Sequence, residues 1–321
     1  MSLRNLWKPD TLERQKLKIA WPDGKKFAFT IIDDTDYSSV ANTKPVYELL
    51  IKCGISATKT VWVYPSRDRD TGSCLLDKSY LKFIKYLMQE GIEIAVHNVG
   101  SGEFTRDEIK AGLEKFKELL GFYPRIQINH AADPDNIYWG YKRFVPPLSW
   151  FMWYKKSYGE DPNSKYFWGD LNKEHVQYIR NRVFNGINTQ KYDSKMPYRV
   201  SSTDKYSNYW FSSSDGHTVE EFNSLLKEKN INLLERDGGF CVVYTHFSYG
   251  FVDKNGQLDK QFEESILRLS SKNGWFVPAG RLLDFLLSIH GSNNYAPYLY
   301  LAKLDGIWFV HRIVKRIRFG R

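Results

Sequence analysis

Carboxylates and imidazoles stand at the ends of several apolar runs in this sequence. Asp33 and Asp34 directly follow the first such run, and His97, His130 and His246 each end a later one. Adjacent like charges repel at close range, and a divalent cation between the two carboxylates would relieve that repulsion. These residue types therefore indicate a metal site with oxygen and nitrogen ligands.

Such a site would suit the hydrolysis of an amide or an ester. A bound metal lowers the pKa of a water molecule toward neutrality and so generates a nucleophile. One aspartate would bind the metal, the other would take the proton from that water, and a histidine across the site would protonate the leaving group. Each residue alone has a simpler explanation, because aspartates after strands often cap turns and single histidines are often structural. Their common position at strand ends favours one shared site.

The elements that must position these residues alternate between strands and helices. Short apolar runs predict strands, and longer amphipathic stretches predict helices. The predicted strands are 26–32, 57–64, 92–97, 125–130, 209–214, 239–246 and 274–277, and the helices are 44–54, 79–91, 105–121, 218–229, 258–271 and 280–289. This alternation predicts an α/β fold with a parallel sheet covered by helices, and about seven units favour a barrel. The carboxyl ends of the strands are the working face of such folds.

One region interrupts this regularity. From 131 to about 205 the sequence is rich in aromatic residues and turn formers, and only 174–184 there reads as a helix. We therefore expect an irregular insertion after the fourth strand. The chain then divides into an N-terminal extension at 1–25, a barrel at 26–289 and a basic amphipathic tail at 290–321.

Composition narrows the class of protein. The chain has 321 residues, of which 42% are hydrophobic and 16% aromatic, so it can bury a full core. Cys53, Cys74 and Cys241 are odd in number and widely spaced, which predicts neither a disulfide framework nor a metal cluster. The N-terminal residues lack the apolar stretch of a secretory signal, so a cytoplasmic protein is expected. The formal net charge of +9 indicates an anionic partner, but no nucleic-acid-binding motif appears and no nucleic acid is expected.

The ordered motifs resemble the polysaccharide deacetylase, or NodB-homology, family. That family opens with T-F-D-D-G after a strand, which "TIIDDTD" resembles, and its H-[S/T]-x-x-H block is matched in part by "HNVGS" at 97–101. The G-x-x-P lead-in to the third block is present as "GFYP" at 121–124. "VVYTHFSYG" at 242–250 and "GWFVPAGRLLDFL" at 274–286 resemble the two late motifs. Together they span residues 26–289 in the family's order.

The resemblance implies a distorted, NodB-like (β/α) barrel that removes acetyl groups from N-acetylated sugars. It implies that Asp33 is the general base, Asp34 a metal ligand, His97 the first metal histidine and His246 the general acid. The family's metal is commonly zinc, with cobalt or nickel tolerated.

Two departures from the family pattern bear on the metal site. Ser101 stands where the family has its second metal histidine, and a hydroxyl is a poor ligand for zinc. The third block normally carries an arginine that braces the catalytic aspartate, and "IQINHAAD" has none. We expect His130 to supply the missing metal ligand, with Asp36 as the second choice. The alternative is a barrel that has lost its metal and its activity.

Five other residues are candidate substrate contacts. Tyr138 and Trp139 could stack on a sugar ring, although aromatic residues in such stretches are more often core. Asp215 precedes a glycine, and a turn alone would explain this pair without any contact to substrate. The five are Ser101, Asn129, Tyr138, Trp139 and Asp215.

The tail has an amphipathic pattern. On a helix, the apolar residues of 307–321 fall along one side and most of the basic residues lie opposite. This pattern suits a helix resting on an anionic membrane surface, or a basic end that packs on the protein. We therefore expect a hydrolase that acts on a nucleotide- or lipid-linked acetylated sugar, peripheral to the inner membrane leaflet. The alternatives are an inactive barrel that binds glycan or scaffolds polysaccharide biosynthesis, and a hydrolase for a non-sugar amide.

Overall fold

Parallel strands form the centre of the molecule. The computed structural model describes residues 19–320, and within that range it contains eight strands. Seven of them close a ring in the order β1-β2-β3-β4-β5-β6-β7, because β1 pairs with both β2 and β7. β8 pairs with the first half of β1, beside the segment that pairs with β2. The strands are β1 (Phe27–Asp33), β2 (Ala57–Val61), β3 (Glu93–Val96), β4 (Ile126–Gln127), β5 (Tyr178–Phe184), β6 (Tyr209–Asp215), β7 (Phe240–Thr245) and β8 (Gly274–Phe276). The predicted (β/α) barrel is confirmed.

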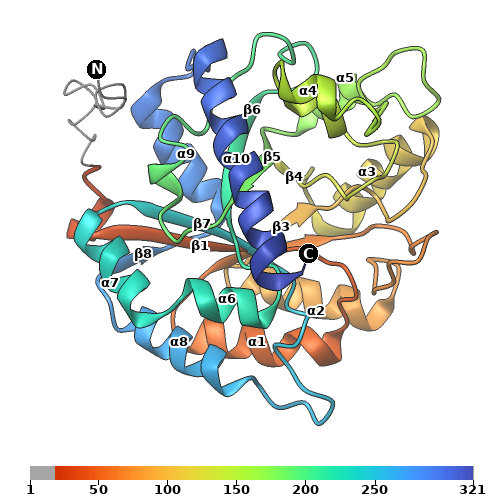
Figure 1. Cartoon of the computed structure of the whole chain (residues 1–321). Helices are drawn as coiled ribbons and strands as arrows, with labels where there is room; N and C mark the ends of the chain where they lie inside the picture. Colours follow the sequence, from red (N-terminus) through yellow and green to blue (C-terminus); the bar gives the residue numbers. More distant parts are fainter. Residues whose placement is uncertain (1–18, 321) are drawn as a thin grey trace, which may run out of the picture.

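Helices cover the outside of this barrel. Figure 1 shows α1, α6, α7 and α8 gathered along one side of it, and α9 on the opposite side. The helices are α1 (Val40–Lys52), α2 (Lys78–Gln89), α3 (Arg106–Leu120), α4 (Leu148–Phe151), α5 (Gly169–His175), α6 (Val219–Leu225), α7 (Glu228–Asp237), α8 (Lys260–Ser270), α9 (Ala279–His290) and α10 (Tyr298–Phe319). α2 illustrates why they pack there: Tyr80, Phe83, Ile84 and Leu87 recur at helical spacing and are buried.

Most predicted elements appear close to their expected bounds, and helix ends follow local chemistry. Thr105 precedes α3 as expected, and the Glu108 carboxylate accepts a hydrogen bond from its backbone N–H at 2.8 Å. α3 ends at Gly121, whose φ of 93° suits a residue without a Cβ. The helix predicted at 218–229 is instead two helices, α6 and α7.

The main error concerns residues 174–184, which were predicted to be helical. The segment Tyr178–Phe184 is strand β5, hydrogen-bonded between β4 and β6. Its Tyr, Ile, Val and Phe residues favour strands, but its apolar residues also recur at helical spacing. The predicted count of about seven strands therefore included β8 and omitted β5. The irregular insertion after the fourth strand is present, and it ends where β5 begins.

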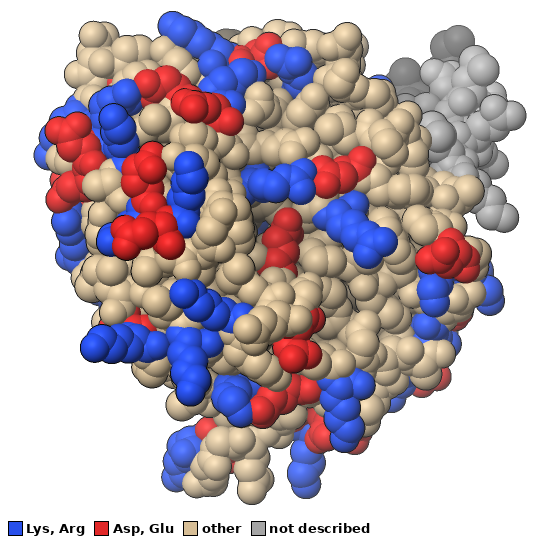
Figure 2. Space-filling model, turned by 180° about the vertical axis from the view of Figure 1, so that it is seen from behind, with Lys and Arg blue, Asp and Glu red and all other residues tan. Residues whose placement is uncertain are grey.

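The C-terminal tail is a helix that packs on the barrel. Trp308 of α10 lies against Phe144, with ring centroids 4.7 Å apart, and Asp305 forms a buried ion pair with Arg182 of β5 at 2.5 Å. Among residues 19–320, no helix combines the length and the apolar character needed to cross a membrane. Most of the predicted N-terminal extension lies outside the described residues. Figure 2 shows the face opposite to α10, where basic and acidic side chains are interspersed.

Candidate metal centre

The two adjacent acids at the end of β1 contact different cations. The Asp33 Oδ2 atom lies 2.9 Å from Lys59 Nζ and accepts a hydrogen bond from the Tyr47 hydroxyl at 3.0 Å. The Asp33 Oδ1 atom accepts the backbone N–H of Phe247 at 2.8 Å. Asp33 and Lys59 are fully buried, and the Asp33 charge raises the pKa of Lys59 although burial opposes it. Asp33 is therefore held inside the protein, and the expected shared cation between Asp33 and Asp34 is wrong.

Asp34 is bound by an arginine that the sequence analysis did not identify. Arg180 donates to both Asp34 oxygens, Nη1 to Oδ1 at 2.9 Å and Nη2 to Oδ2 at 2.5 Å. Burial alone would raise the pKa of Asp34, but the charge of Arg180 and those of nearby imidazoles outweigh it and lower the pKa. The Arg180 guanidinium also lies 4.5 Å from the Tyr244 ring centroid. Arg180 was missed because it lies on β5, which was predicted as a helix.

The carboxylate that meets the histidines belongs to Asp36. Its Oδ1 atom lies 3.3 Å from His97 Nε2 and 3.5 Å from His130 Nε2, and its Oδ2 atom lies 3.1 Å from His246 Nε2. Burial would raise the pKa of Asp36, but the imidazoles of His97 and His246 hold that pKa well below its ordinary value. The segments that follow β1, β3 and β4 carry Asp36, His97 and His130. This is the position expected for a site at the carboxyl end of a parallel barrel.

Two of these imidazoles are already oriented as metal ligands. His97 Nδ1 lies 2.8 Å from the carbonyl oxygen of Ile128, which can only accept, so Nδ1 carries the hydrogen. His130 Nδ1 lies 3.1 Å from a carboxylate oxygen of Asp133. A partner at Nδ1 leaves the Nε2 lone pair for a metal, and such outer partners recur in protein metal sites.

The donor set fits a divalent metal. The Asp36 Oδ1 atom is buried and has no hydrogen-bond partner among the described residues, although it faces two imidazole nitrogens. Asp36, His97 and His130 form a group whose ligand atoms all lie within 4.8 Å of one another. One carboxylate and two imidazoles are a ligand set that zinc takes in open sites. Compared with the sequence-based assignment, His97 and His130 remain in the group, and Asp36 replaces Asp34.

A second acidic group adjoins the first one. Asp68, Asp70 and His130 also have ligand atoms within 4.8 Å of one another. Ser101 belongs to this neighbourhood, because its hydroxyl donates to Asp68 Oδ1 at 2.6 Å. Asp68 is exposed and Asp70 half-buried, so this group lies nearer to solvent than Asp36, His97 and His130 do.

His246 lies beside the group and holds a proton readily. Burial would lower its pKa, but the hydrogen bond to Asp36 and the charges of Asp36 and Asp34 outweigh burial and raise it. Its ring centroid lies 4.5 Å from that of His217, which the sequence analysis did not place in the site. His217 Nδ1 lies 2.6 Å from the Tyr244 hydroxyl. A histidine two residues after a strand end was the available signal for His217.

Backbone conformation at the site departs from the usual regions. Tyr37 and Asn98 have φ values of 56° and 51°, and they directly follow Asp36 and His97. Residues other than glycine adopt such values at a cost of roughly 1–3 kcal/mol, and they concentrate at functional sites. The surrounding contacts therefore fix the direction of both Asp36 and His97.

The other predicted substrate contacts lie away from the histidines or are engaged in structural contacts. The Asn129 side-chain amide is hydrogen-bonded to the backbone of Ile137 at both ends. Trp139 lies under Arg143 at 5.4 Å, and Tyr138 packs edge-on against Trp210 of β6. These contacts support the alternative that both aromatic residues are structural.

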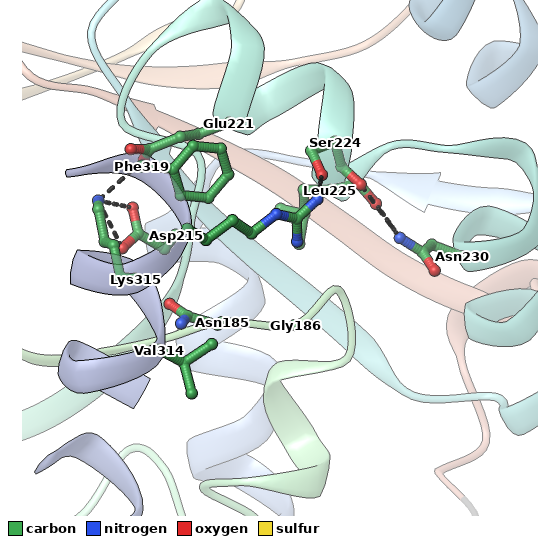
Figure 3. A pocket seen from close by; sticks show the side chains of 11 residues that line it. Asn185, Gly186, Asp215, Glu221, Ser224, Leu225, Asn230, Val314, Lys315 and Phe319 are labelled. Carbon is green, nitrogen blue, oxygen red and sulfur yellow. Dashed lines mark hydrogen bonds and ion pairs between the residues drawn. The ribbon is translucent and has the colours of Figure 1, made fainter. Parts of the chain in front are cut away.

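Asp215 is engaged by the C-terminal helix. Both its oxygens accept from Lys315 Nζ of α10, at 2.9 and 2.8 Å, and Lys315 also donates to Glu221 at 2.8 Å. Figure 3 shows Lys315 reaching from α10 toward both carboxylates, with Phe319 beside Glu221. The expectation that Asp215 binds substrate is therefore not supported by its contacts, which attach the tail to the barrel.

We expect the metal-free protein to lose stability as the pH rises from about 6.5 to about 9. Burial would lower the pKa of His130, but the hydrogen bond to Asp133 and the charge of Asp36 raise it from 6.5 to about 9. Its contribution is therefore complete below pH 6.5 and disappears as the pH passes about 9. On the order of 3 kcal/mol of unfolding free energy depends on this proton.

Denaturant titrations in the presence of a chelator measure this loss. His130→Gln should flatten the profile over this range, whereas His175→Gln, which removes a histidine stacked on Tyr123, should leave it unchanged. An equal slope in wild type and His130→Gln would contradict the assignment.

Comparison with known proteins reveals similarity in fold alone. The sequence matches no family model and no curated protein. Puue allantoinase has a crystal structure that superimposes with a TM-score of 0.51 at 10% identity, over 84% of this chain and 93% of that chain. A family 4 acetyl xylan esterase from Clostridium thermocellum, in complex with a cobalt ion, gives 0.40 at 15% identity, over 82% and 91%. The chitin deacetylase of Colletotrichum lindemuthianum gives 0.42 at 13% identity, over 81% and 88%. At these identities, the match to the allantoinase establishes a common barrel architecture.

Proposed function

We propose that this chain is a metal-dependent hydrolase that removes the N-acetyl group from an acetylated amino sugar. One observation carries the proposal: the unpartnered Asp36 Oδ1 atom faces the Nε2 atoms of His97 and His130. These three residues would hold the metal, which we propose to be zinc, with cobalt or nickel able to replace it. When bound, such a metal lowers the pKa of water and polarises an acyl oxygen.

Asp34 is the general base in this proposal, in place of Asp33. Its carboxylate is ionised at neutral pH and lies close enough to His97 and His246 for their charges to act on it, so in this proposal it takes the proton from the attacking water. The bidentate contact with Arg180 fixes the direction of the carboxylate. Arg180 thereby takes the position of the bracing arginine that the sequence resemblance led us to expect elsewhere. Asp33 becomes a positioning residue, because it binds the backbone directly after His246.

His246 is the general acid. Its raised pKa favours a bound proton near neutrality, which suits protonation of a departing amine. It lies beside the proposed ligand group and outside it, with Nε2 against Asp36 Oδ2 and Nδ1 3.4 Å from the His217 carbonyl oxygen. These two contacts hold the His246 ring in place between Asp36 and the backbone of His217.

Aromatic rings lead from His246 to the surface. The Tyr249 ring centroid lies 4.7 Å from that of His246, and the Tyr37 centroid lies 5.8 Å from that of Tyr249. Tyr37 is 39% exposed, so a sugar could stack on it from solvent. This path, together with the sequence resemblance, supports an acetylated sugar or glycan precursor as the substrate. We further propose that this sugar is carried on a nucleotide or a lipid, because the tail is basic.

Metal analysis and acetate release together test the proposal. We expect about one metal ion per purified chain at the group of Asp36, His97 and His130, and release of acetate from N-acetylglucosamine oligomers or from a nucleotide-linked N-acetylglucosamine. A chelator should remove both, and zinc should restore both. Absence of metal and of acetate release would favour the alternative, an inactive barrel that binds glycan.

Asp34→Asn is expected to lower kcat by roughly 10²- to 10⁴-fold, the usual contribution of a general base. The metal should remain, because Asp34 is outside the ligand group. Steady-state kinetics and metal content measure the two effects. Asp204→Asn is the matched control. Asp204 also pairs with an arginine, Arg199, and neither residue belongs to the proposed site. Full turnover by Asp34→Asn would exclude it as the base.

A further inference from the structure

The outward side of α10 carries an apolar stripe that the barrel does not cover. Phe309 is 49% exposed, Val310 56%, Ile313 46% and Ile317 81%. Their spacing of three to four residues places them along one side of a helix. Asp305, Trp308 and Lys315, by contrast, face the protein and make the contacts that attach α10.

Basic residues flank this stripe. Arg312, Arg316 and Arg318 are all exposed on the same helix. Within residues 19–320, Arg318 donates to the Ser224 hydroxyl at 2.7 Å, and neither Arg312 nor Arg316 forms an ion pair. Apolar residues bordered by uncompensated cations complement a surface that offers both hydrocarbon and negative charge.

A second apolar surface lies on and after α4. Trp150 is 69% exposed, Phe151 73%, Trp153 65% and Tyr154 61%. Contiguous exposure of large aromatic side chains is uncommon on a soluble surface and marks contact with another molecule. The sequence analysis placed this region in an irregular insertion, and these four rings are exposed.

Direct contacts join the two surfaces on one side of the molecule. Tyr298 at the start of α10 donates to the carbonyl oxygen of Pro146 at 2.7 Å, two residues before α4. The Arg143 guanidinium lies 5.0 Å from the Trp308 ring centroid and 5.4 Å from that of Trp139. Figure 1 shows α4 near the N-terminal half of α10.

Cations crowd the seam between these surfaces. Burial lowers the pKa of Arg143, and the charges of Arg182 and Arg312 lower it further. Burial likewise lowers the pKa of Lys155, and Arg143 and Arg312 add to the effect. The buried Arg143 Nε atom has no hydrogen-bond partner among the described residues. An anion at this seam would relieve the repulsion between the cations.

We propose that the stripe on α10 and the aromatic residues around α4 form one docking face for an anionic phospholipid bilayer. Phe309, Ile317 and Phe151 enter the boundary between headgroups and acyl chains, where Trp and Tyr are also favoured. Arg312 and Arg316 contact the phosphates of anionic lipids. On the opposite face, Figure 2 shows acidic side chains interspersed among the basic ones. This inference goes beyond the proposed catalytic function and does not depend on it.

Vesicle co-sedimentation of the full chain tests the face. We expect binding to vesicles of phosphatidylcholine mixed with phosphatidylglycerol, and little binding to phosphatidylcholine alone. Arg312→Gln with Arg316→Gln should weaken binding roughly 30-fold, because each of the two arginines contributes a similar share of the binding free energy at an anionic surface. Phe309→Ser with Ile317→Ser should weaken it roughly 100-fold or more, because two apolar side chains no longer leave water.

Matched variants control for net charge and surface polarity. Lys110→Gln with Lys229→Gln removes the same charge from other exposed sites, and Leu76→Ser with Leu267→Ser replaces side chains that are each 49% exposed. Both should bind as the wild type does, and circular dichroism should be the same for all variants. Failure of the wild type to bind anionic vesicles, or equal losses in the controls, would overturn the proposal. A dimer that dissociates on Phe309→Ser with Ile317→Ser, without vesicle binding, would identify the face as a protein interface instead.

Discussion

Asp36→Asn is expected to remove the bound metal and to abolish acetate release. The substitution replaces the anionic oxygen that faces the two imidazoles with a neutral amide. Loss of a residue that only hydrogen-bonds a metal ligand lowers metal affinity roughly 10- to 100-fold. Loss of a direct ligand should lower the affinity further. Metal content after dialysis and acetate release under saturating substrate measure the two losses. The fold should survive, because Asp36 makes few contacts that support the barrel.

Asp70→Asn distinguishes the two acidic groups that share His130. Asp70 Oδ2 lies 3.7 Å from His130 Nε2, slightly farther than Asp36 Oδ1. If the metal is held by Asp36, His97 and His130, Asp70→Asn should keep it. Loss of metal in Asp70→Asn together with retention in Asp36→Asn would place the ion at the other group.

Asp33→Asn is expected to lower the free energy of unfolding by about 3 to 5 kcal/mol, as is usual when one partner of a buried ion pair is removed. Lys59 is fully buried, and its ammonium would lose the carboxylate that lies 2.9 Å away. Chemical denaturation at neutral pH measures the loss. The same variant should retain its metal, which separates this structural role from the catalytic role that the sequence suggested.

Removal of both charges is the control for this pair. Asp33→Asn with Lys59→Met leaves no unpaired buried charge, and it should recover part of the stability lost by Asp33→Asn alone. Recovery should be incomplete, because Tyr47 and the Phe247 backbone also donate to Asp33. A double variant no more stable than Asp33→Asn would show that the hydrogen bonds, and not the Lys59 charge, account for the loss.

The adjacent acids illustrate how the same residues admit two physical explanations. A cation does relieve the repulsion between Asp33 and Asp34, but there are two cations, Lys59 and Arg180, and both belong to the protein. Side chains alternate in direction along an extended chain, and β1 ends at Asp33. Asp33 and Asp34 meet cations on different strands, Lys59 of β2 and Arg180 of β5. Asp36 lies in the turn after β1, and only the tertiary structure brings its carboxylate to His97 and His130.

The C-terminal helix resolves a choice that the sequence left open. One side of α10 packs on the barrel through Lys315 and Asp305, as one of the two expectations had it. Phe309 and Ile317 face outward, and contact of that side with a membrane stays a prediction. An amphipathic pattern reveals that a helix has two sides. It does not reveal what each side contacts.

The sequence by itself determined the alternation of strands and helices, which favoured a barrel, and the edge at which the site lies. Hydrophobic periodicity is a local property, so β1, β3 and β7 could be located from neighbouring residues alone, and with them His97, His246 and the acids after β1. Only the tertiary structure decided which acid meets which cation. Lys59 reaches Asp33 through the pairing of β1 with β2, across 26 residues of sequence, and Arg180 reaches Asp34 from β5, across 146 residues. The β5 segment Tyr178–Phe184 has a local pattern that fits a helix as well as a strand, and its pairing with β4 and β6 settles the choice.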